Sequence, residues 1–376
     1  MRVLVSPDSF KGSLEATKVA EIIKEAILSI YPSWEVETFP LADGGEGTAE
    51  ILKKYYPLEQ RIVTVDATFK EITSCYHTDL SGRKAFIESA AAIGLPMIPS
   101  SMRNPLNASS LGLGILIKAA ITNGAQDITV ALGGSATCDC GMGMMRALGW
   151  EFLDKEGRRL KGVGRDLNEV KKIWDKNDYW LLEIKWKALC DVENPLYGSE
   201  GAARVFAPQK GATQEDVEIL EEGLQHFSEI AVKEGLTKKA DSNVPGSGAA
   251  GGLGFAFHSF LNSPLIKGID FILDILDYDN KLQDIDLVIT GEGKIDRQSL
   301  MGKVMSGVVS KARKKNIPVI AFGGKTADCA ILKEAGLKGI YEISNPKLSE
   351  EENMKREEAE LNLRQKVIEV ISRYRD

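Results

Sequence analysis

The sequence predicts an α/β protein with two domains: a Rossmann- or flavodoxin-like parallel-sheet domain built from both chain ends, and a mixed α/β domain inserted within it. Three observations predict this arrangement. Strand and helix patterns alternate at both ends of the chain, as in parallel strands joined by crossover helices. The middle contains successive strand patterns without long helices between them. The length of 376 residues corresponds to two domains at ~150 residues each.

The N-terminal part begins with a short β-branched run at residues 2–6. Ser13 is the predicted N-cap of a helix whose apolar stripe recurs at helical spacing over 14–30. A second strand is predicted at 35–40, and a glycine-rich turn at 41–47 opens the next helix. This order of strand, helix, strand and helix predicts parallel pairing of the two strands.

The middle of the chain marks the inserted domain. Its predicted strands follow one another closely, at 61–65, 73–78 and 84–88. We place the inserted domain at 66–284, which leaves 1–65 and 285–376 for the parallel-sheet domain.

The C-terminal part returns to the alternating pattern, with strands predicted at 286–290, 318–322 and 339–343. In the last helix, Met354, Leu361 and Ile368 recur at seven-residue steps, with Val367 and Ile371 beside them. We expect this stripe to pack on the sheet while the charged residues face solvent.

Composition excludes several classes of function. The net charge of -7 and the lack of a basic block argue against nucleic acid or an anionic membrane as partner. No apolar run approaches the ~20 residues of a membrane helix, and the N-terminal apolar stretch is too short for a signal peptide.

The odd number of cysteines, 5, indicates reduced thiols and a cytoplasmic protein. The 3 histidines lack metal-ligand spacing, which disfavours zinc catalysis and a Ser-His-Asp hydrolase. Within the C-x-C at 138–140 we expect Cys138 and Cys140 to be small packing residues.

Glycine is the informative excess, with 36 residues gathered in turns at predicted strand ends. The turns are PDSFKGS (7–13), DGGEGT (43–48), LGGSAT (132–137), DVENP (191–195) and GEGKID (291–296). In open α/β sheets ligands lie beyond the carboxyl ends of the strands. Backbone N–H groups in such turns hold phosphate oxygens, and glycine permits their close approach. Carboxylates beside phosphate-binding loops indicate Mg²⁺.

Neither standard nucleotide motif is satisfied. The segment GSGAAG (246–251) has the spacing of a dinucleotide fingerprint, but the residues before it do not form a strand. The segment GKT (324–326) follows a strand, but Val319 stands where a P-loop requires its first glycine. A nucleotide site in this chain is therefore of another type.

Seven longer segments stand out along the chain: PDSFKGSL (7–14), PLADGGEGT (40–48), LGGSAT (132–137), DVENPL (191–196), GAARVFAPQKGA (201–212), PGSGAAGGLG (245–254) and DLVITGEGKIDRQSLMGK (286–303). Taken together and in this order, they resemble the bacterial type I glycerate kinase family over essentially the whole chain. The resemblance implies ATP-dependent phosphorylation of D-glycerate to 2-phosphoglycerate, with the active site between two α/β domains. One departure is Cys138-Asp139-Cys140-Gly141, where the family has Asn-Asp-Gly-Gly; it puts in doubt a ligand role for position 138 and a close backbone approach at 140.

Phosphoryl transfer needs positioning, charge neutralisation and an acceptor for the hydroxyl proton. We expect ATP and Mg²⁺, with Asp191 as the base and Asp43 with Glu46 nearer the metal, although the sequence leaves the division between the two aspartates open. The compact charge of Lys11 suits the glycerate carboxylate and completes the catalytic set. The other substrate-binding candidates are Asp8, Ser9, Asn194 and Lys210. The nucleotide-binding candidates are Gly133, Gly134, Ser135, Gly291, Glu292, Gly293, Asp296 and Lys303. Lys303 as a helix-surface charge and Asp296 as an N-cap are the alternatives.

Other functions compatible with this pattern stay open at this point. Among enzymes, the alternative is a kinase of the 3-hydroxyl of glycerate or of another short hydroxy-acid. Outside enzymes, the alternative is a two-domain regulator that closes on a small anion. Such a regulator does not need carboxylates beside its phosphate site, because they would repel the anion unless a metal lay between them. In each case the partner is a small molecule, and the protein is expected to be a monomer or a homodimer.

Overall fold

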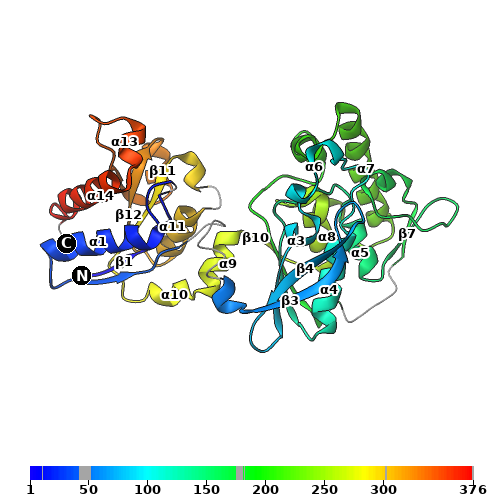
Figure 1. Ribbon diagram of the computed structural model, residues 1–376, viewed down its shortest axis with the longest axis horizontal. Coiled ribbons are helices and arrows are strands. Elements are labelled where there is room, and N and C mark those ends of the chain that lie inside the picture. The colour runs from blue at the N-terminus through cyan, green and yellow to red at the C-terminus, as the bar shows by residue number, and fades with distance from the viewer. Residues whose placement is uncertain (11, 42–51, 175–180, 182, 301–302, 375–376) are drawn as a thin grey trace. The chain divides into compact units, whose positions relative to one another are not determined.

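The computed structural model describes residues 1–10, 12–41, 52–174, 181, 183–300 and 303–374. The chain forms two compact units: Met1–Leu52 with Gly268–Asp376, called here the first unit, and Lys53–Lys267, the second unit. Both chain ends belong to the first unit (Figure 1). Among the described residues, no helix combines the length and the apolar character needed to cross a membrane.

The first unit contains a five-stranded sheet in the order β13-β12-β11-β1-β2, and every neighbouring pair is parallel. Its strands are β1 (Arg2–Val5), β2 (Glu35–Thr38), β11 (Leu287–Ile295), β12 (Val319–Thr326) and β13 (Leu337–Glu342). Its described helices are α1 (Ala16–Ile30), α9 (Gly268–Ile275), α10 (Tyr278–Lys281), α11 (Val304–Lys314), α12 (Cys329–Glu334), α13 (Glu350–Met354) and α14 (Arg356–Ile371).

Helices cover both faces of this sheet. Side chains alternate along β1, so Val3 and Val5 join the core beneath α1 and α14, whereas Leu4 joins the core beneath α9 and α11. Burial on both faces explains why β1 reads as a continuous apolar run rather than an alternating one. This is the predicted parallel-sheet domain made from both chain ends.

The second unit contains a mixed six-stranded sheet in the order β10-β9-β6-β5-β4-β3, with antiparallel pairing only from β5 to β3. Its strands are β3 (Leu58–Val65), β4 (Glu71–Thr78), β5 (Lys84–Glu88), β6 (Asp127–Ala131), β9 (Lys185–Leu189) and β10 (Leu265–Ile266). A separate two-stranded sheet pairs β7 (Glu151–Leu153) with β8 (Lys172–Trp174). The described helices are α3 (Ala90–Ile93), α4 (Leu111–Thr122), α5 (Met142–Ala147), α6 (Ala202–Phe206), α7 (Gln214–Lys233) and α8 (Ala249–Leu261). The predicted α/β class, with parallel and mixed sheets, is confirmed.

The boundaries of the units differ from those predicted at 65/66 and 284/285. The strand β3 belongs to the second unit because it pairs with β4 along its whole length. At the other boundary, Ile269, Leu273 and Tyr278 pack into the core of the first unit. The predicted position 65/66 separates two strands that form one hairpin, and the predicted position 284/285 separates α9 and α10 from the strand β11 that they cover.

Two details of the predicted helices are wrong. Glu15, not Ser13, is the N-cap of α1, and its side chain makes no capping hydrogen bond. In the last helix the predicted seven-residue repeat faces solvent, since Leu361 and Ile368 are 49% and 38% exposed, whereas the predicted Val367 and Ile371 are buried. The buried face of α14 consists of Ala359, Asn362, Leu363, Val367, Val370 and Ile371.

Candidate active site

The topology of the first unit creates a crevice between β1 and β11. From β1 the chain passes through α1 to β2 on one side, whereas from β11 it passes through α11 and α12 to β12 and β13 on the other. The carboxyl ends of strands at such a reversal of strand order form the usual ligand site of open α/β sheets. A cavity of about 260 Å³ lies there, lined by the loop after β1, by β11 and β12, and by the segment after β13 through α14.

The loop after β1 brings two predicted site residues into this cavity. Asp8 and Ser9 both line it, and Asp8 is only 4% exposed. The Asp8 backbone N–H donates to the carbonyl of Gly291 over 2.8 Å, and the Ser9 N–H donates to the Asp8 carboxylate over 2.6 Å. Ser13 also lines the cavity, and its buried hydroxyl has no hydrogen-bond partner among the described residues. The loop therefore presents a fixed carboxylate and a hydroxyl to the cavity.

The predicted turn at 291–293 is wrong, because β11 continues through it. Gly291 and Glu292 pair with Phe322 and Gly323 of β12, so this backbone belongs to the sheet. Gly291 is needed for packing, since a Cβ there would lie 2.5 Å from the Phe322 carbonyl oxygen. Glu292 and Gly293 nevertheless line the cavity, so their nucleotide-binding role stays a prediction.

Three lysines border the cavity, and two are held in ion pairs. Lys294 lies 3.0 Å from the Asp296 carboxylate, and Lys325 lies 2.6 Å from that of Glu350. The hydrogen bond from Lys325 holds the pKa of Glu350 below its ordinary value. Lys303 is the N-cap residue of α11 and makes no ion pair with any residue that the structure describes. It is the lysine best placed here to meet an anionic ligand.

One wall of the cavity was not predicted from the sequence. This wall consists of Ile343, Ser344, Glu350, Asn353, Met354, Ala359 and Asn362. Asn353 organises it, because its Nδ2 donates to three carbonyls between Asn345 and Ser349 while its Oδ1 accepts from the Asn345 N–H and from Asn362. Isolated asparagines in a charged segment form no recognisable motif.

The second unit gathers the other predicted residues at one edge of its sheet. Because β5, β6 and β9 are parallel neighbours, their carboxyl ends meet at that edge. The glycine loop at 132–137 follows β6, and the Asp191 loop follows β9. The structure therefore brings these two loops side by side, as the strand order predicts.

The glycine loop has its carbonyl groups bound and its amide groups open. The Ser89 hydroxyl donates to the carbonyl of Gly133, and the Leu95 N–H donates to that of Gly134. Within the described part of the chain, the N–H groups of Gly133, Gly134 and Ser135 donate to no acceptor. Consecutive open N–H groups of this kind form a concavity that suits an anion.

Gly133 is not explained by the protein itself. A Cβ at this position would meet no atom of the described residues within 4 Å, and its φ lies outside the left-handed range, unlike the φ of +75° at Gly134. Neither the described packing nor the backbone geometry therefore demands glycine at 133. The missing side chain leaves this stretch of backbone open to close approach.

Lys210 lies beneath this loop and is only 3% exposed. Its ammonium donates to the carbonyl of Thr137 over 2.8 Å and to the hydroxyl of Ser135 over 3.3 Å. Burial lowers the pKa of Lys210 below its ordinary value. The geometry supports a role in positioning the loop, in place of the direct contact with substrate that we expected.

The Asp191 loop is exposed and is fixed by its neighbours. The Asn194 side chain donates to the carbonyl of Glu200 over 2.8 Å, and the Asn194 carbonyl accepts from the Gly248 N–H over 2.9 Å. Glu193 forms an ion pair with Lys267 over 2.9 Å. Asn194 therefore shapes the turn that carries Asp191, and its amide donor is already used within the protein.

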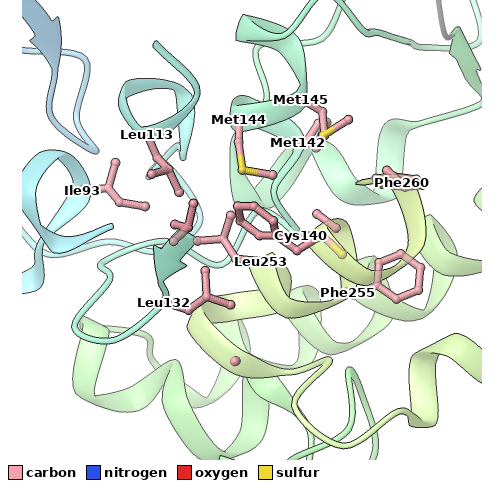
Figure 2. Packing of buried hydrophobic residues seen from close by; sticks show 14 of the residues in the cluster. Ile93, Leu113, Leu132, Cys140, Met142, Met144, Met145, Leu253, Phe255 and Phe260 are labelled. Carbon is pink, nitrogen blue, oxygen red and sulfur yellow. The ribbon is translucent and has the colours of Figure 1, made fainter. Parts of the chain in front are cut away.

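The C-x-C segment is structural, as predicted. Cys138 and Cys140 are 1% and 0% exposed, and Figure 2 shows Cys140 among apolar side chains that include Leu253 and Phe255. Burial raises the pKa of the Cys138 thiol to about 12 and that of Cys140 well above its ordinary value, so both stay protonated. Cys140 adopts a φ of 52°, a left-handed conformation that glycine adopts at less cost than cysteine.

Three predicted site residues lie outside the described residues: Lys11, Asp43 and Glu46. Their roles therefore stay predictions.

Comparisons with known proteins agree with this picture. The sequence matches the model of the glycerate kinase family over residues 3–374. It is 38% identical to the glycerate kinase of Bacillus subtilis (strain 168) over 349 residues, covering 91% of this chain and 90% of that protein. It is likewise 38% identical to the glycerate 2-kinase of Escherichia coli (strain K12) over 346 residues, covering 91% and 90%. A crystal structure from Salmonella typhimurium LT2, of a protein provisionally named glycerate kinase 2, superposes with a TM-score of 0.78 at 36% identity, covering 99% of this chain and 97% of that one. The chain belongs to the glycerate kinase family.

Proposed function

We propose that this chain transfers the γ-phosphoryl group of ATP to the 2-hydroxyl of D-glycerate, giving 2-phosphoglycerate. The observation that carries the proposal is the 38% identity, over 91% of the chain, to the Escherichia coli protein named glycerate 2-kinase. The geometry supports it with two features that phosphoryl transfer requires, an open set of backbone N–H donors and carboxylates at the carboxyl ends of strands.

The glycine loop at 132–135 is the proposed phosphate site. Its N–H groups offer hydrogen bonds that strengthen with charge on the phosphate oxygens. Its fixed carbonyls keep those N–H groups in place before the ligand arrives, so little reorganisation is needed on binding. Lys210 holds the far end of the loop through Thr137.

The carboxylates divide between proton transfer and metal binding. Asp191, exposed on a turn that Asn194 fixes, is the proposed base and accepts the proton of the substrate hydroxyl. Asp43 and Glu46 would hold Mg²⁺, since carboxylates are the hard oxygen donors that this ion prefers, and the ion would neutralise charge on the phosphate oxygens. Asp8, held by the Ser9 N–H, is proposed to orient a hydroxyl of the acceptor.

The direct test is ADP release from ATP over a panel of short hydroxy-acids, with NMR of the phosphorylated product. We expect D-glycerate to be the best acceptor and phosphorus to appear on the 2-oxygen. A product carrying phosphate on the 3-oxygen would refute the regiochemistry but keep the kinase. Turnover undiminished in excess EDTA would refute the metal requirement, and nucleotide binding without turnover on any acceptor would favour a regulator.

Gly133→Ala tests the phosphate loop. Because the added methyl group meets no atom of the described residues within 4 Å, the free energy of unfolding should change by less than about 1 kcal/mol. The methyl group would instead obstruct the approach of phosphate, and losing a charge-assisted hydrogen bond should raise the KM for ATP about ten- to hundredfold. Gly134→Ala is the contrast, since its φ of +75° predicts a loss of stability as well. Normal kinetics in Gly133→Ala would remove the loop from the site.

Asp191→Asn tests the assignment of the base. Asparagine keeps the shape but cannot accept the proton, so kcat should fall by ~10²–10⁴ while both KM values change little. Asp43→Asn should instead weaken Mg²⁺·ATP and recover partly when Mg²⁺ is raised. Glu193→Gln is the matched control, because this neighbouring carboxylate is already paired with Lys267. Rescue of Asp191→Asn by Mg²⁺, with none for Asp43→Asn, would mean that the two roles are exchanged.

A further inference from the structure

One face of the β3–β4 hairpin gathers a carboxylate, a thiol and an imidazole. The strand register sets Glu59 opposite His77 and Arg61 opposite Cys75. Since side chains alternate along each strand, these four residues project from the same face. One donor atom from each of Glu59, Cys75 and His77 lies within 4.8 Å of the others.

This face is the one that α3 and α4 leave uncovered. The intervening β4 residues point to the helices, because the Ser74 hydroxyl donates to the Ala91 carbonyl over 2.5 Å and the Tyr76 hydroxyl accepts from Asn123 over 2.7 Å. Cys75 and His77 are therefore on the opposite face, where both are half-buried and Glu59 is exposed. A dissolved cation can reach all three.

Arg61 already orients the carboxylate. Its Nε donates to Oε1 of Glu59 over 2.5 Å, while the other oxygen, Oε2, lies 3.8 Å from Nε2 of His77. The ligating carboxylates of metal sites are commonly held in this way by a hydrogen bond from outside the ligand set. One oxygen is fixed by the arginine, and the second is directed at the imidazole.

We propose that Glu59, Cys75 and His77 form a binding site for one divalent cation of the zinc class, separate from the reaction proposed above. Tetrahedral zinc with bonds of about 2.0–2.3 Å sets its ligands about 3.3–3.8 Å apart. The Oε2 of Glu59 and Nε2 of His77 are already 3.8 Å apart, and since all donors lie within 4.8 Å the others need to close by at most about 1.5 Å. Water completes the coordination. Burial and the Glu59 carboxylate raise the pKa of the Cys75 thiol, so cation binding releases that proton to solvent. The thiolate distinguishes this site from one for Mg²⁺, which prefers oxygen.

Cobalt titration of the full chain, in millimolar Mg²⁺ to occupy oxygen-only sites, gives the test. We expect one Co²⁺ per chain with a thiolate-to-metal absorption band, and loss of that band when one equivalent of Zn²⁺ is added. Cys75→Ser should abolish the band, and His77→Ala should weaken the Kd at least about tenfold. Cys329→Ser, at a half-buried thiol of the other unit, should leave both unchanged.

The proposal fails on any of three results. These are no saturable band, a band that survives Cys75→Ser, or a Kd for His77→Ala equal to that of the unsubstituted chain. Glu59→Gln provides a second variant that keeps the side-chain shape and the contact with Arg61, and it should also weaken the Kd. Thermal unfolding of each variant without metal confirms that the hairpin is intact.

Discussion

Replacing Asp139 with asparagine should destabilise the second unit, because this buried carboxylate accepts four hydrogen bonds. Its Oδ2 accepts from the N–H and the hydroxyl of Ser110, both over 2.7 Å, and from the Gly143 N–H over 3.1 Å. Its Oδ1 accepts from the Gly141 N–H over 3.1 Å. Burial raises the pKa of Asp139, and these hydrogen bonds oppose the shift. A carboxylate surrounded only by donors is best satisfied in the ionised form.

The size of the effect follows from this geometry. Asparagine has one oxygen, which can occupy the Oδ2 position and keep three of the bonds. Its NH₂ group then faces the N–H of Gly141, so the Gly141 N–H loses its acceptor and the new NH₂ group has none. Each unsatisfied donor costs about 1–3 kcal/mol, and relief from burying a charge offsets part of this. We expect the free energy of unfolding to fall by about 2–4 kcal/mol.

Urea unfolding followed by tryptophan fluorescence measures this change, because Trp150 and Trp186 are buried in the second unit. The midpoint should fall while the m-value stays constant. Asp79→Asn is the control. The hydrogen bonds that Asp79 accepts from the Ser81 hydroxyl and the Lys84 N–H are exposed, so water can replace them and the loss should stay below about 1 kcal/mol. An unchanged midpoint for Asp139→Asn would show that the carboxyl is neutral in the folded protein, which would refute the reasoning.

Two further substitutions test the surroundings of the glycine loop. Lys210→Met removes the ammonium beneath Thr137, so kcat should fall about ten- to hundredfold while urea unfolding shows a fold that is retained. Since burial lowers the pKa of Lys210 from 10.5, the unsubstituted protein should gain stability as pH rises towards that value, and Lys210→Met should abolish the gain. Cys140→Gly relieves a left-handed φ of 52° but vacates a buried position, so the two effects of ~1–2 kcal/mol each should nearly cancel; a loss beyond ~3 kcal/mol would show that the thiol packs more tightly than we infer.

The sequence predicted the sheets well because their strands carry strong local patterns. The apolar run containing Val3, Leu4 and Val5 predicts a strand buried on two faces, as the structure shows. The mixed sheet was predicted from successive strands without long helices between them. The face of the last helix was predicted only in part, since Val367 and Ile371 are buried but Leu361 and Ile368 are exposed. The seven-residue repeat fits a helix stripe, but packing beside α1 selects the neighbouring stripe, and no local pattern distinguishes the two.

The features of the candidate site follow from the sequence where backbone chemistry decides and escape it where tertiary packing does. The glycine-rich turn at the end of β6 could be located from the sequence, and its binding role stays a prediction. The burial of Lys210 could not be predicted, since it depends on Thr137, a residue distant in sequence that the fold brings against it. The contribution of Asn353 to the cavity likewise depends on how α13 packs after β13.

The first unit also has a consequence for synthesis on the ribosome. Its interior strand β1 is made well before its partner β11, because 284 residues separate Arg2 from Asp286. At ~5–20 residues per second this delay lasts on the order of 15–60 s. The second unit is contiguous in sequence, so it can fold before β11 is made. During that time the apolar strand β1 has no β11 to pair with, and we expect a chaperone to bind it. A circular permutant beginning at Gly268 would shorten that exposure by making both halves of the first unit consecutively.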